Sequence, residues 1–589
     1  MHLKCRVRRK DGKEHRTWSI VESRRVAGRV VHHHVLYLGE VNDRQKASWE
    51  KAVSVVDESS GTMRQLELLP EDRVITPGEV DAVQVRLSAM SLERPRQWGA
   101  CWLADTLWRQ LHLDSFFGEK LGRSREGTDW EKVLRVLVVY RLLSPGSEWR
   151  LHRQWFGTTA LPDLLGVDER AAHPATLYRC LDLLLAEKAA LFAHLRERWR
   201  DLFAARYEIL LYDLTSTYFE CDVPEDETDP RRFGYSRDRR SDCVQVVIAL
   251  VVTPEGLPLA YEMLPGNTAD KTTLLAMLEL VQKRHGQAQR IWVMDRGVPT
   301  EAALAQMRAS TPPVHYLVGT PKARLNRMEA ALTERPWVEV RGALRVKCVR
   351  EDGEVYVLTE SPARVDKERS MRRRALKKYW KRLGELSRLK APTRDELLLK
   401  LGKAAGEAGA AAKLIDTVVS PEGGLSYQLN RDKLRIVRRR EGRYLLRTNL
   451  TDYDPDALWR YYMQLVFVEE AFRTLKGDLA IRPVYHQKPD RIEAHLFVAF
   501  LAYCLSITLR QQLRGLARGL MPRAVFEKLA TVQMLDVRVP TTDGRELLLI
   551  RRTEPAPDVT LVLQQLSLDL PAQPPPRIRT PASPSKPTV

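Results

Sequence analysis

The chain has 589 residues, 44% of them hydrophobic, and a formal net charge of +19 at pH 7. That length exceeds what one hydrophobic core usually supports, so several domains are expected. The positive charge favours a polyanionic partner, although charge alone does not distinguish nucleic acid from a membrane surface. The seven cysteines form no Cys-x-x-Cys pair, which argues against a zinc site and for reduced thiols in the cytoplasm.

No membrane segment is expected. The first residues include lysine and arginine and lack the apolar core of a signal peptide. The longest apolar segment, 496–507, is too short to span a bilayer and is typical of a buried core helix. We therefore expect a cytoplasmic protein with no membrane partner.

The N-terminal part predicts two modules. Residues 3–38 alternate as strands do, and a helix is expected over 43–56, which together make a small α+β module. The three histidines at 32–34 cannot converge on one ion, because successive strand residues point to opposite faces. A string of helices follows up to residue 202, and the segment 175–184 is either a recognition helix or a plain packing helix.

Three acids stand out in the central part of the chain. Asp213 lies in the middle of an apolar run, 208–220, that predicts a buried strand, where a lone carboxylate needs a cation or a hydrogen-bond network. Asp295 stands where a second apolar strand, 290–297, meets a glycine-containing turn, and Glu469 lies in a segment of helical periodicity. Two strand-borne aspartates and one helix-borne glutamate provide the oxygen ligands of a two-metal phosphoryl-transfer site.

Each acid also has an ordinary explanation. An aspartate at a strand end often caps a turn, and a glutamate on an amphipathic helix usually faces solvent. The elements between the acids favour the metal-site hypothesis, because strand, hairpin, helix, strand, helix and strand is the order of the ribonuclease H-like fold. These elements are expected at 208–220, 245–252 with 257–263, 271–284, 290–297, 301–308 and 315–319.

The motifs around these acids resemble those of the DDE transposases of bacterial insertion sequences, in the insertion-sequence-four superfamily. That superfamily has a signature of Tyr, two residues, Arg, three residues, Glu, six residues, Lys. Tyr462, Glu469 and Lys476 fit its spacing, whereas Leu465 occupies the arginine position. Arg473, one helical turn after Glu469, could reach the same face. The motifs that carry the resemblance are 213–219, 264–270, 295–297 and 462–476.

The resemblance extends over about residues 205–505 and implies a transposase that cleaves insertion-sequence DNA ends and transfers the strands by cut-and-paste. It implies two Mg²⁺ ions, or Mn²⁺ in their place, held by Asp213, Asp295 and Glu469. The implied partners are double-stranded DNA, as terminal inverted repeats and target, and a second copy of the chain in a synaptic homodimer. The expected location is the bacterial cytoplasm, at the nucleoid when DNA is bound.

The spacing between Asp295 and Glu469, 469 − 295 = 174 residues, requires an inserted domain. Strands are expected in its first part, a basic helical stretch at 364–403, and strands again at 434–437 and 444–448. The basic stretch is either a solvated face or a DNA contact, because its cations alternate with aromatic residues. The residues expected to contact DNA there are Arg372, Arg373, Lys377 and Lys381.

A second basic patch, 231–240, lies between the first two core strands and predicts a loop that grips the scissile phosphates beside the metal site. The alternative is a disordered surface loop. The residues of this patch expected to contact DNA are Arg237, Arg239 and Arg240. Near the metal site and on the signature helix, the expected DNA contacts are Arg296, Tyr462, Arg473 and Lys476. Tyr462, Glu469 and Lys476 are seven residues apart, so they are expected along one helix face.

The expected fold class is multidomain α/β, with a ribonuclease H-like catalytic core and a β-rich insertion domain, preceded by a small α+β module and a helical DNA-binding domain. Two other functions share parts of this pattern, a ribonuclease H-like nuclease without strand transfer and a non-catalytic DNA-binding protein derived from a transposase. The expected boundaries, from the N-terminal module with its linker to a disordered tail, are 1–95, 96–205, 206–320, 321–448, 449–520, 521–570 and 571–589.

Overall fold

The computed structural model describes residues 2–10, 13–26, 29–40, 53–57, 62–70, 82–286, 289–295, 297–320, 336–341, 344–389, 393–517 and 519–580. It is a mixed α/β protein that divides into two compact units. The first unit combines Met1–Arg198 with Thr474–Val589, and the second is Trp199–Arg473. Two helices, α8 (Lys188–Phe203) and α16 (Val466–Lys476), contain the points at which the chain passes from one unit to the other.

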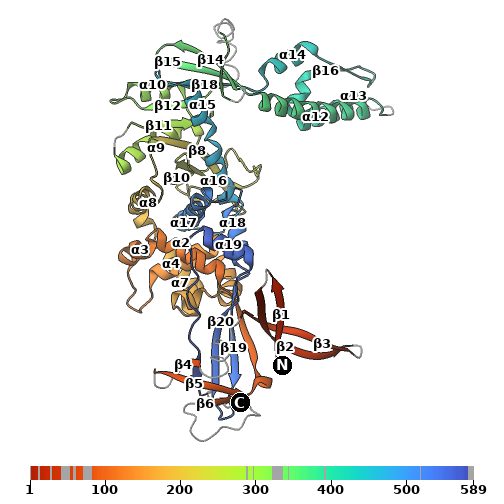
Figure 1. Ribbon diagram of the computed structural model, residues 1–589. Helices are drawn as coiled ribbons and strands as arrows, with labels where there is room; N and C mark the ends of the chain where they lie inside the picture. The colour runs from red at the N-terminus through yellow and green to blue at the C-terminus, as the bar shows by residue number, and fades with distance from the viewer. Residues whose placement is uncertain are drawn as a thin grey trace. The chain divides into compact units, whose positions relative to one another are not determined.

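The second unit is built on a nine-stranded sheet of order β10-β9-β8-β11-β12-β18-β15-β14-β13 (Figure 1). Strands β8, β11 and β12 are parallel to one another, and every other neighbouring pair is antiparallel. The strands are β8 (Ile209–Phe219), β9 (Val244–Val252), β10 (Pro258–Pro265), β11 (Ile291–Met294), β12 (His315–Gly319), β13 (Val338–Arg341), β14 (Leu344–Glu351), β15 (Glu354–Glu360) and β18 (Arg443–Thr448).

The core of this unit lies between the sheet and two helices, α9 (Asp270–His285) and α10 (Glu301–Ala309). Tyr212 of β8 and Trp292 of β11 meet there edge to face, with ring centroids 6.2 Å apart. All nine residues of β9 are buried, which explains why its sequence is apolar except for Gln245. The expected order of strand, hairpin, helix, strand, helix and strand is therefore observed over residues 209–319.

The inserted segment does not form a separate β domain among the described residues, because β13, β14, β15 and β18 extend the same sheet. The basic stretch expected to be helical at 364–403 forms two helices. They pack their apolar faces together beside a two-stranded sheet and a third helix. These elements are α12 (Pro362–Leu386), α13 (Arg394–Ala408), β16 (Ile415–Val419), β17 (Leu425–Leu429) and α14 (Arg431–Arg440).

The strand expected at 434–437 is wrong, because those residues belong to helix α14. The side chain of Asn430 caps this helix by accepting a hydrogen bond of 2.9 Å from the backbone N–H of Lys433. Asp432 lies in the first turn, and three arginines follow in the last turn, which complements the helix dipole at both ends. These end effects outweigh the strand preference of Ile436 and Val437.

The signature segment is two helices and not one. Helix α15 (Pro455–Met463) ends before Gln464, and α16 begins at Val466. The expectation that Tyr462 shares a helix face with Glu469 and Lys476 is therefore wrong. Of the three, only Glu469 and Lys476 lie on the same helix, seven positions or about two turns apart.

The helices of the first unit surround the long apolar helix α17 (Pro489–Arg514), which packs against α4. Helix α17 is long and apolar enough to cross a membrane, but 89% of its most apolar window is buried within the protein, as expected for a core helix. The other helices include α2 (Gly99–Gln110), α3 (Leu113–Leu121), α4 (Trp130–Leu143), α5 (Glu148–Arg150), α6 (Leu161–Leu165), α7 (Pro174–Leu181), α18 (Pro522–Leu529) and α19 (Pro557–Gln565).

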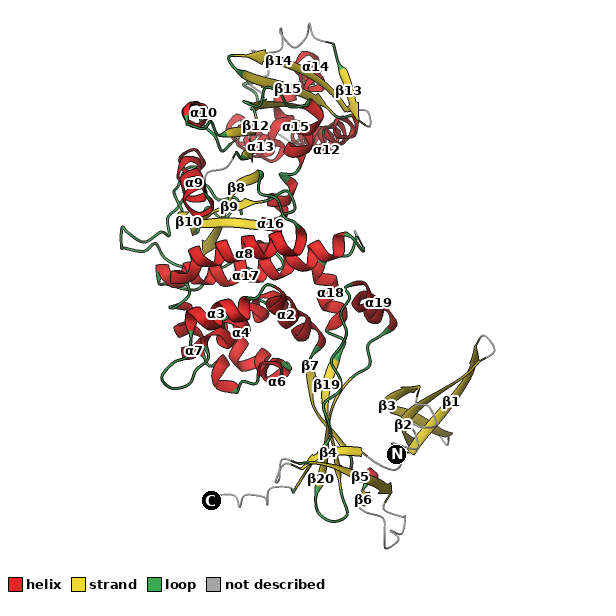
Figure 2. Ribbon diagram, turned by 60° about the vertical axis from the view of Figure 1, so that its left-hand side comes forward, coloured by secondary structure: helices red, strands yellow, loops and turns green. Residues whose placement is uncertain are grey.

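The two ends of the chain share a seven-stranded sheet of order β6-β5-β4-β21-β20-β19-β7. Figure 2 shows β7 and β19 running side by side, as their antiparallel pairing requires. A separate three-stranded sheet is made by the first three strands. The strands are β1 (His2–Lys10), β2 (Lys13–Val26), β3 (Arg29–Glu40), β4 (Val53–Asp57), β5 (Met63–Pro70), β6 (Ala82–Val85), β7 (Ser91–Gln97), β19 (Gln533–Pro540), β20 (Glu546–Arg552) and β21 (Arg577–Arg579).

This sheet corrects two expectations. The helix expected at 43–56 falls partly outside the described residues, and its last part is strand β4. Of the tail expected to be disordered over 571–589, the described part, up to residue 580, contains β21, which pairs with both β20 and β4, and residues 581–589 lie outside the described residues. The side chain of Arg551 also donates a hydrogen bond of 2.6 Å to the carbonyl of Pro574. A proline-rich composition suggested disorder, but pairing with distant strands orders this segment.

Candidate active site

Three carboxylates from distant parts of the second unit line one cavity of about 610 Å³. Asp213 lies within β8, Asp295 directly follows β11, and Glu469 lies in the first turn of α16. Strands β8 and β11 are parallel neighbours in which Met294 pairs with Tyr212. The residue that follows Tyr212 is Asp213, and the residue that follows Met294 is Asp295. The sheet register therefore brings the two acids to the same level.

The electrostatics of Asp213 show that the three acids influence one another. The pKa of Asp213 is raised to about 7, mainly by burial, and the charges of Asp295 and Glu469 contribute to the rise. The backbone N–H of Leu214 and the charge of Arg237 act in the opposite direction. Cations bound among these carboxylates would relieve their repulsion, and hard oxygen ligands are those that Mg²⁺ takes in proteins.

Tyr462 supports the second acid. Its hydroxyl donates a hydrogen bond of 3.1 Å to Oδ1 of Asp295. A Cβ atom on Gly319, the last residue of β12, would lie 2.4 Å from that hydroxyl, so the glycine leaves the space that the phenol occupies. The ring of Tyr462 also lies 6.4 Å from that of Tyr444 and 6.3 Å from that of Trp459. Tyr462 is thus positioned by an aromatic cluster.

The basic loop 231–240 is anchored to the core. The backbone of Arg232 exchanges hydrogen bonds of 3.1 and 2.9 Å with that of Gln245 in β9. The side-chain amide of Gln245 donates to the carbonyls of Tyr235 and Gly266. A Cβ on Gly266 would lie 2.0 Å from the carbonyl of Gln245, so only glycine allows these segments to approach so closely. The disordered-loop alternative is therefore not supported.

The three arginines of this loop differ in their surroundings. Arg237 forms an ion pair with Asp270 at the start of α9, and its charge lowers the pKa of Asp213. Arg240 is paired with Asp242 at 3.0 Å and with Glu220 at 2.8 Å. Arg239 is exposed. Arg237 is thus the member of this loop whose charge acts on the acids.

The signature segment contributes to the cavity unevenly. Tyr462, Glu469 and the apolar Leu465 line it, whereas Arg473 and Lys476 do not. Arg473 is exposed on α16 and Lys476 is half-buried. Arg296, which follows Asp295 directly, lies outside the described residues.

Four further residues with charged or aromatic side chains line the cavity and were not singled out by sequence patterns: Arg364 and Glu368 of α12, and Arg443 and Tyr444 at the start of β18. No local motif marks them. Their positions depend on α12 and β18 meeting beside the acids, which no short spacing encodes.

Only some of the basic side chains of α12 are exposed and free to contact DNA. Arg373, Lys377 and Lys381 are exposed at four-residue spacing, on one face of the helix. The side chain of Arg372 is only 9% exposed and is paired with Glu441 at 2.5 Å. That ion pair joins α12 to the segment before β18, so the expected DNA contact is not supported for Arg372.

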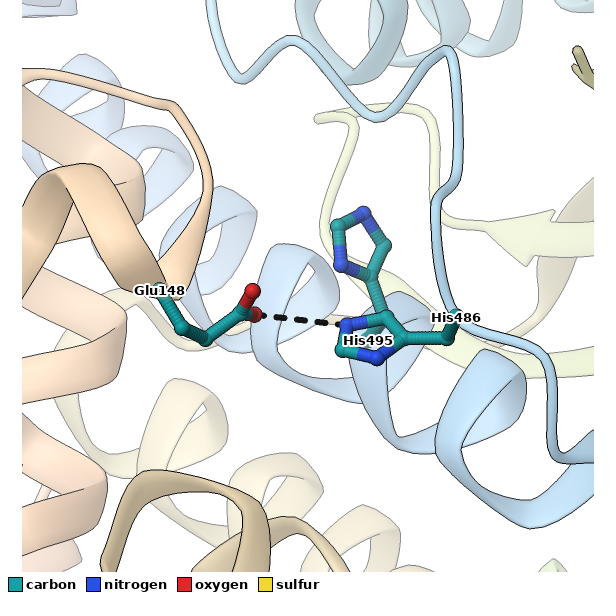
Figure 3. A group of neighbouring side chains, drawn as sticks. All are labelled: Glu148, His486 and His495. Atoms are coloured by element: carbon teal, nitrogen blue, oxygen red, sulfur yellow. Dashed lines mark ion pairs between the residues drawn. The ribbon is translucent and has the colours of Figure 1, made fainter. Parts of the chain in front are cut away.

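Among the described residues, one group of metal-ligand types has its ligand atoms within 4.8 Å of one another: Glu148, His486 and His495 (Figure 3). His486 Nε2 lies 3.3 Å from Glu148 Oε1, and all three side chains are buried. The buried guanidinium of Arg141 stands 3.4 Å from His495 Nδ1. A metal ion here would face that fixed cation, so the group is better explained as a buried ion pair.

Comparison with known proteins identifies transposase families and transposase structures that are similar to this chain. The family model for the transposase DDE domain matches residues 219–505, and that for the N-terminal domain of IS1634 family transposases matches residues 3–62. A piggyBac transposase synaptic complex with hairpin DNA is similar at 10% identity and a TM-score of 0.33, over 75% of this chain and 82% of that chain. A Mos1 transposase paired-end complex with the left transposon end has 14% identity and a TM-score of 0.11, over 23% and 46%. No curated protein matches the chain.

The two structural similarities are too slight to establish a shared fold. The family matches stand on their own. The DDE match contains Asp295 and Glu469, and Asp213 lies six residues before its start (219 − 213). The other match covers most of the N-terminal strands. The chain is a DDE transposase of an insertion sequence.

Proposed function

We propose that this transposase cuts the DNA ends of its element and joins them to a target strand, with Asp213, Asp295 and Glu469 as the catalytic acids. The observation that carries the proposal is that these acids, distant in sequence, line one cavity. The influence of Asp295 and Glu469 on the pKa of Asp213 supports their acting as one group.

The strand order supports a ribonuclease H-like core. Strands β10, β9 and β8 are antiparallel neighbours, and β8, β11 and β12 continue the sheet in parallel. Asp213 on the central strand and Asp295 at the end of the adjacent parallel strand then face a common edge. In this proposal α16 supplies the third acid, and β13–β15 with β18 widen the core sheet.

The three carboxylates offer the hard oxygen ligands that divalent cations prefer, and they would hold two such ions, Mg²⁺ or Mn²⁺. When bound, such ions lower the pKa of an attacking water and stabilise the leaving 3′ oxygen. The carboxylates would hold the ions, and Tyr462 would hold Asp295 in place through its hydrogen bond. The freed 3′ hydroxyl would then attack the target strand in the same site.

Duplex DNA would be held by cations beside the cavity. The exposed residues Arg373, Lys377 and Lys381 of α12 offer three charges at four-residue spacing, the pattern of a phosphate-binding face. Further contacts would come from Arg237, Arg239 and Arg240 of the anchored loop. Arg473 and Lys476 would contact DNA from α16, and Arg296 is proposed from its sequence position alone.

The proposal extends to the larger assembly. The helical segment 96–205 would bind the terminal inverted repeats, and two copies of the chain would meet in a synaptic homodimer. A transposase acting on chromosomal DNA would work in the cytoplasm, at the nucleoid.

A joining assay tests the proposed function. Purified protein is incubated with Mg²⁺, a labelled duplex that carries the end of its own element, and a circular plasmid. The expected product is labelled plasmid, absent with Asp295→Asn. Cut duplex without labelled plasmid would indicate a nuclease, and binding without either product would indicate a DNA-binding derivative.

A further inference from the structure

The cavity of the three acids also has a basic wall. Arg364 of α12 and Arg443 of β18 line it, whereas α16 contributes only apolar Val466 and Val468 besides Glu469. A DNA strand brought to the acids carries negative charge into a site that is already acidic. The cations that line this cavity are therefore candidates for contacting that strand.

The two arginines differ in how far the protein already satisfies them. Arg443 Nε donates to Glu360 at 2.7 Å, and Arg345 also binds Glu360. Burial alone would raise the pKa of Glu360, but the hydrogen bonds and charges of these two arginines hold it below its usual range. Arg443 thus belongs to an ion-pair network in which it shares Glu360 with Arg345.

Arg364 is held differently. Its guanidinium lies 5.2 Å from the ring centre of Tyr444, and its Nε donates a hydrogen bond of 3.3 Å to Glu368. The second oxygen of Glu368 accepts a hydrogen bond of 3.0 Å from the backbone N–H of Gly442. Glu368 and Tyr444 therefore fix the plane of the guanidinium. Its two terminal amino groups have no hydrogen-bond partner among the residues that the structure describes, and the side chain is 46% exposed.

This support is connected to the acids. Tyr444 contacts Tyr462 at 6.4 Å between ring centres, and Tyr462 in turn donates to Asp295. A guanidinium fixed through its Nε presents its two terminal nitrogens as a fork, the geometry that binds a phosphate with two hydrogen bonds. One cluster of aromatic side chains thus supports both Arg364 and a catalytic acid.

We propose that Arg364 binds a phosphate of the DNA strand that enters this cavity, next to the bond that is cut. The inference rests on the proposed function and adds a residue to its substrate site. Glu368 and Tyr444 then act as positioning residues for the guanidinium.

Binding to DNA with single neutral phosphates tests the inference. The duplex carries the end of the element, one methylphosphonate replaces one phosphate near the cut in turn, and Ca²⁺ replaces Mg²⁺ to prevent cleavage. Arg364→Ala is expected to weaken binding of the unmodified duplex about tenfold, as loss of a charge-assisted contact does. At one position the methylphosphonate should weaken the wild type by a similar factor and leave Arg364→Ala unchanged. Arg364→Lys should retain part of the affinity.

A matched control lies on the same helix. Arg382 pairs with Glu385 at 2.8 Å, is 53% exposed and does not line the cavity. At every position, the methylphosphonate should weaken DNA binding by Arg382→Ala as much as it weakens binding by the wild type. Wild-type affinity in Arg364→Ala, or a methylphosphonate effect that persists in it at every position, would overturn the inference. If either of these two results were obtained while the wild type cut its own end with Mg²⁺, only the inference about Arg364 would fail and the proposed function would survive. If the wild type did not cut, the proposed function itself would fail.

Discussion

The hydroxyl of Tyr462 lies 3.1 Å from Oδ1 of Asp295, although the two residues are 167 positions apart. Asp295 follows the last residue of β11, and Tyr462 is in the last turn of α15, just before the break that precedes α16. The break lets α15 present a phenol and α16 present a carboxylate to the same cavity. One uninterrupted helix would fix both side chains along a single face.

Tyr462→Phe removes this hydrogen bond and keeps the ring. Hydrogen bonds to charged groups contribute about 1.5 to 3 kcal/mol, and the exposure of this pair favours the lower end. We expect cleavage to slow about tenfold, while the melting temperature and DNA affinity stay near those of the wild type. Single-turnover cleavage measured beside a thermal melt checks this. An unchanged cleavage rate would remove Tyr462 from the site.

Gly319→Ala tests the space beneath the same phenol. The added Cβ would lie 2.4 Å from the hydroxyl and 3.1 Å from the ring carbon that bears it, so Tyr462 must move from Asp295. We expect a loss of cleavage at least as large as in Tyr462→Phe. Gly402→Ala is the control, because a Cβ there meets nothing within 4 Å. Alanine at that position in α13 should leave cleavage unchanged and raise stability slightly.

The sequence predicted the strands at Asp213 and Asp295 and the helix that carries Glu469. Buried strands have mostly apolar sequences, and a carboxylate within or directly after such a run is conspicuous, as Asp213 and Asp295 are. The cavity wall could not be predicted in this way. Arg364 and Tyr444 are 80 residues apart (444 − 364), and their contact depends on how α12 packs beside β18.

Local patterns also failed where distant partners decide the structure. Val53–Asp57 is a strand because β5 and β21 flank it, and Arg577–Arg579 is ordered because β20 and β4 do the same. Strand pairing between the two ends of a chain leaves no signal in either end alone. The end of α15 at Met463 was missed for another reason, because no glycine or proline marks the turn at Gln464.

Neutral variants of the acids should separate catalysis from binding. Asp213→Asn, Asp295→Asn and Glu469→Gln remove one negative charge each and hardly change shape, so each should abolish cleavage with Mg²⁺. Affinity for an end duplex should stay equal to that of the wild type or rise, because repulsion of the phosphates falls. Gel-based cleavage and anisotropy with the same duplex measure the two effects. A variant that cuts at the wild-type rate would exclude its residue from the site.

The exposed cations of α12 should determine part of the salt dependence of binding. Replacing Arg373, Lys377 and Lys381 by alanine should reduce the slope of log affinity against log salt by up to about 3, near 0.9 for each phosphate contact. Exposed cations of α13 provide a control of equal charge: Arg394, Lys400 and Lys403, also replaced by alanine. An equal effect of the two triple variants would mean that net charge, and not this face of α12, determines the slope.

Acid should destabilise the first unit through its buried group of Glu148, His486 and His495 (Figure 3). Although burial opposes it, the hydrogen bond and charge of His486 hold the pKa of Glu148 at about 2, below the ordinary 4.5. The stability that Glu148 contributes is therefore complete above pH 4.5 and is lost as the pH falls toward 2. Burial, with the charge of Arg141, lowers the pKa of His495 well below 6.5.

The histidine acts in the same direction as the carboxylate. His495 is neutral in the fold, so protonation of the unfolded chain below pH 6.5 favours unfolding. We expect the melting temperature to fall as the pH drops below about 6.5, and more steeply below 4.5.

Glu148→Gln separates the carboxylate from the histidine. It should destabilise the protein at neutral pH by about 3 to 5 kcal/mol, the usual cost of breaking a buried ion pair, because the carboxylate that pairs with His486 and attracts the buried Arg141 is lost. It should also flatten the dependence of the melting temperature on pH below 4.5 and retain the part below 6.5, since His495 is unchanged. Glu119→Gln, at a side chain that is 80% exposed, is the control and should follow the wild type at every pH. If Glu148→Gln showed the same steep loss below 4.5 as the wild type, other carboxylates would be responsible for it. The buried group would then stabilise the helices by packing rather than by charge.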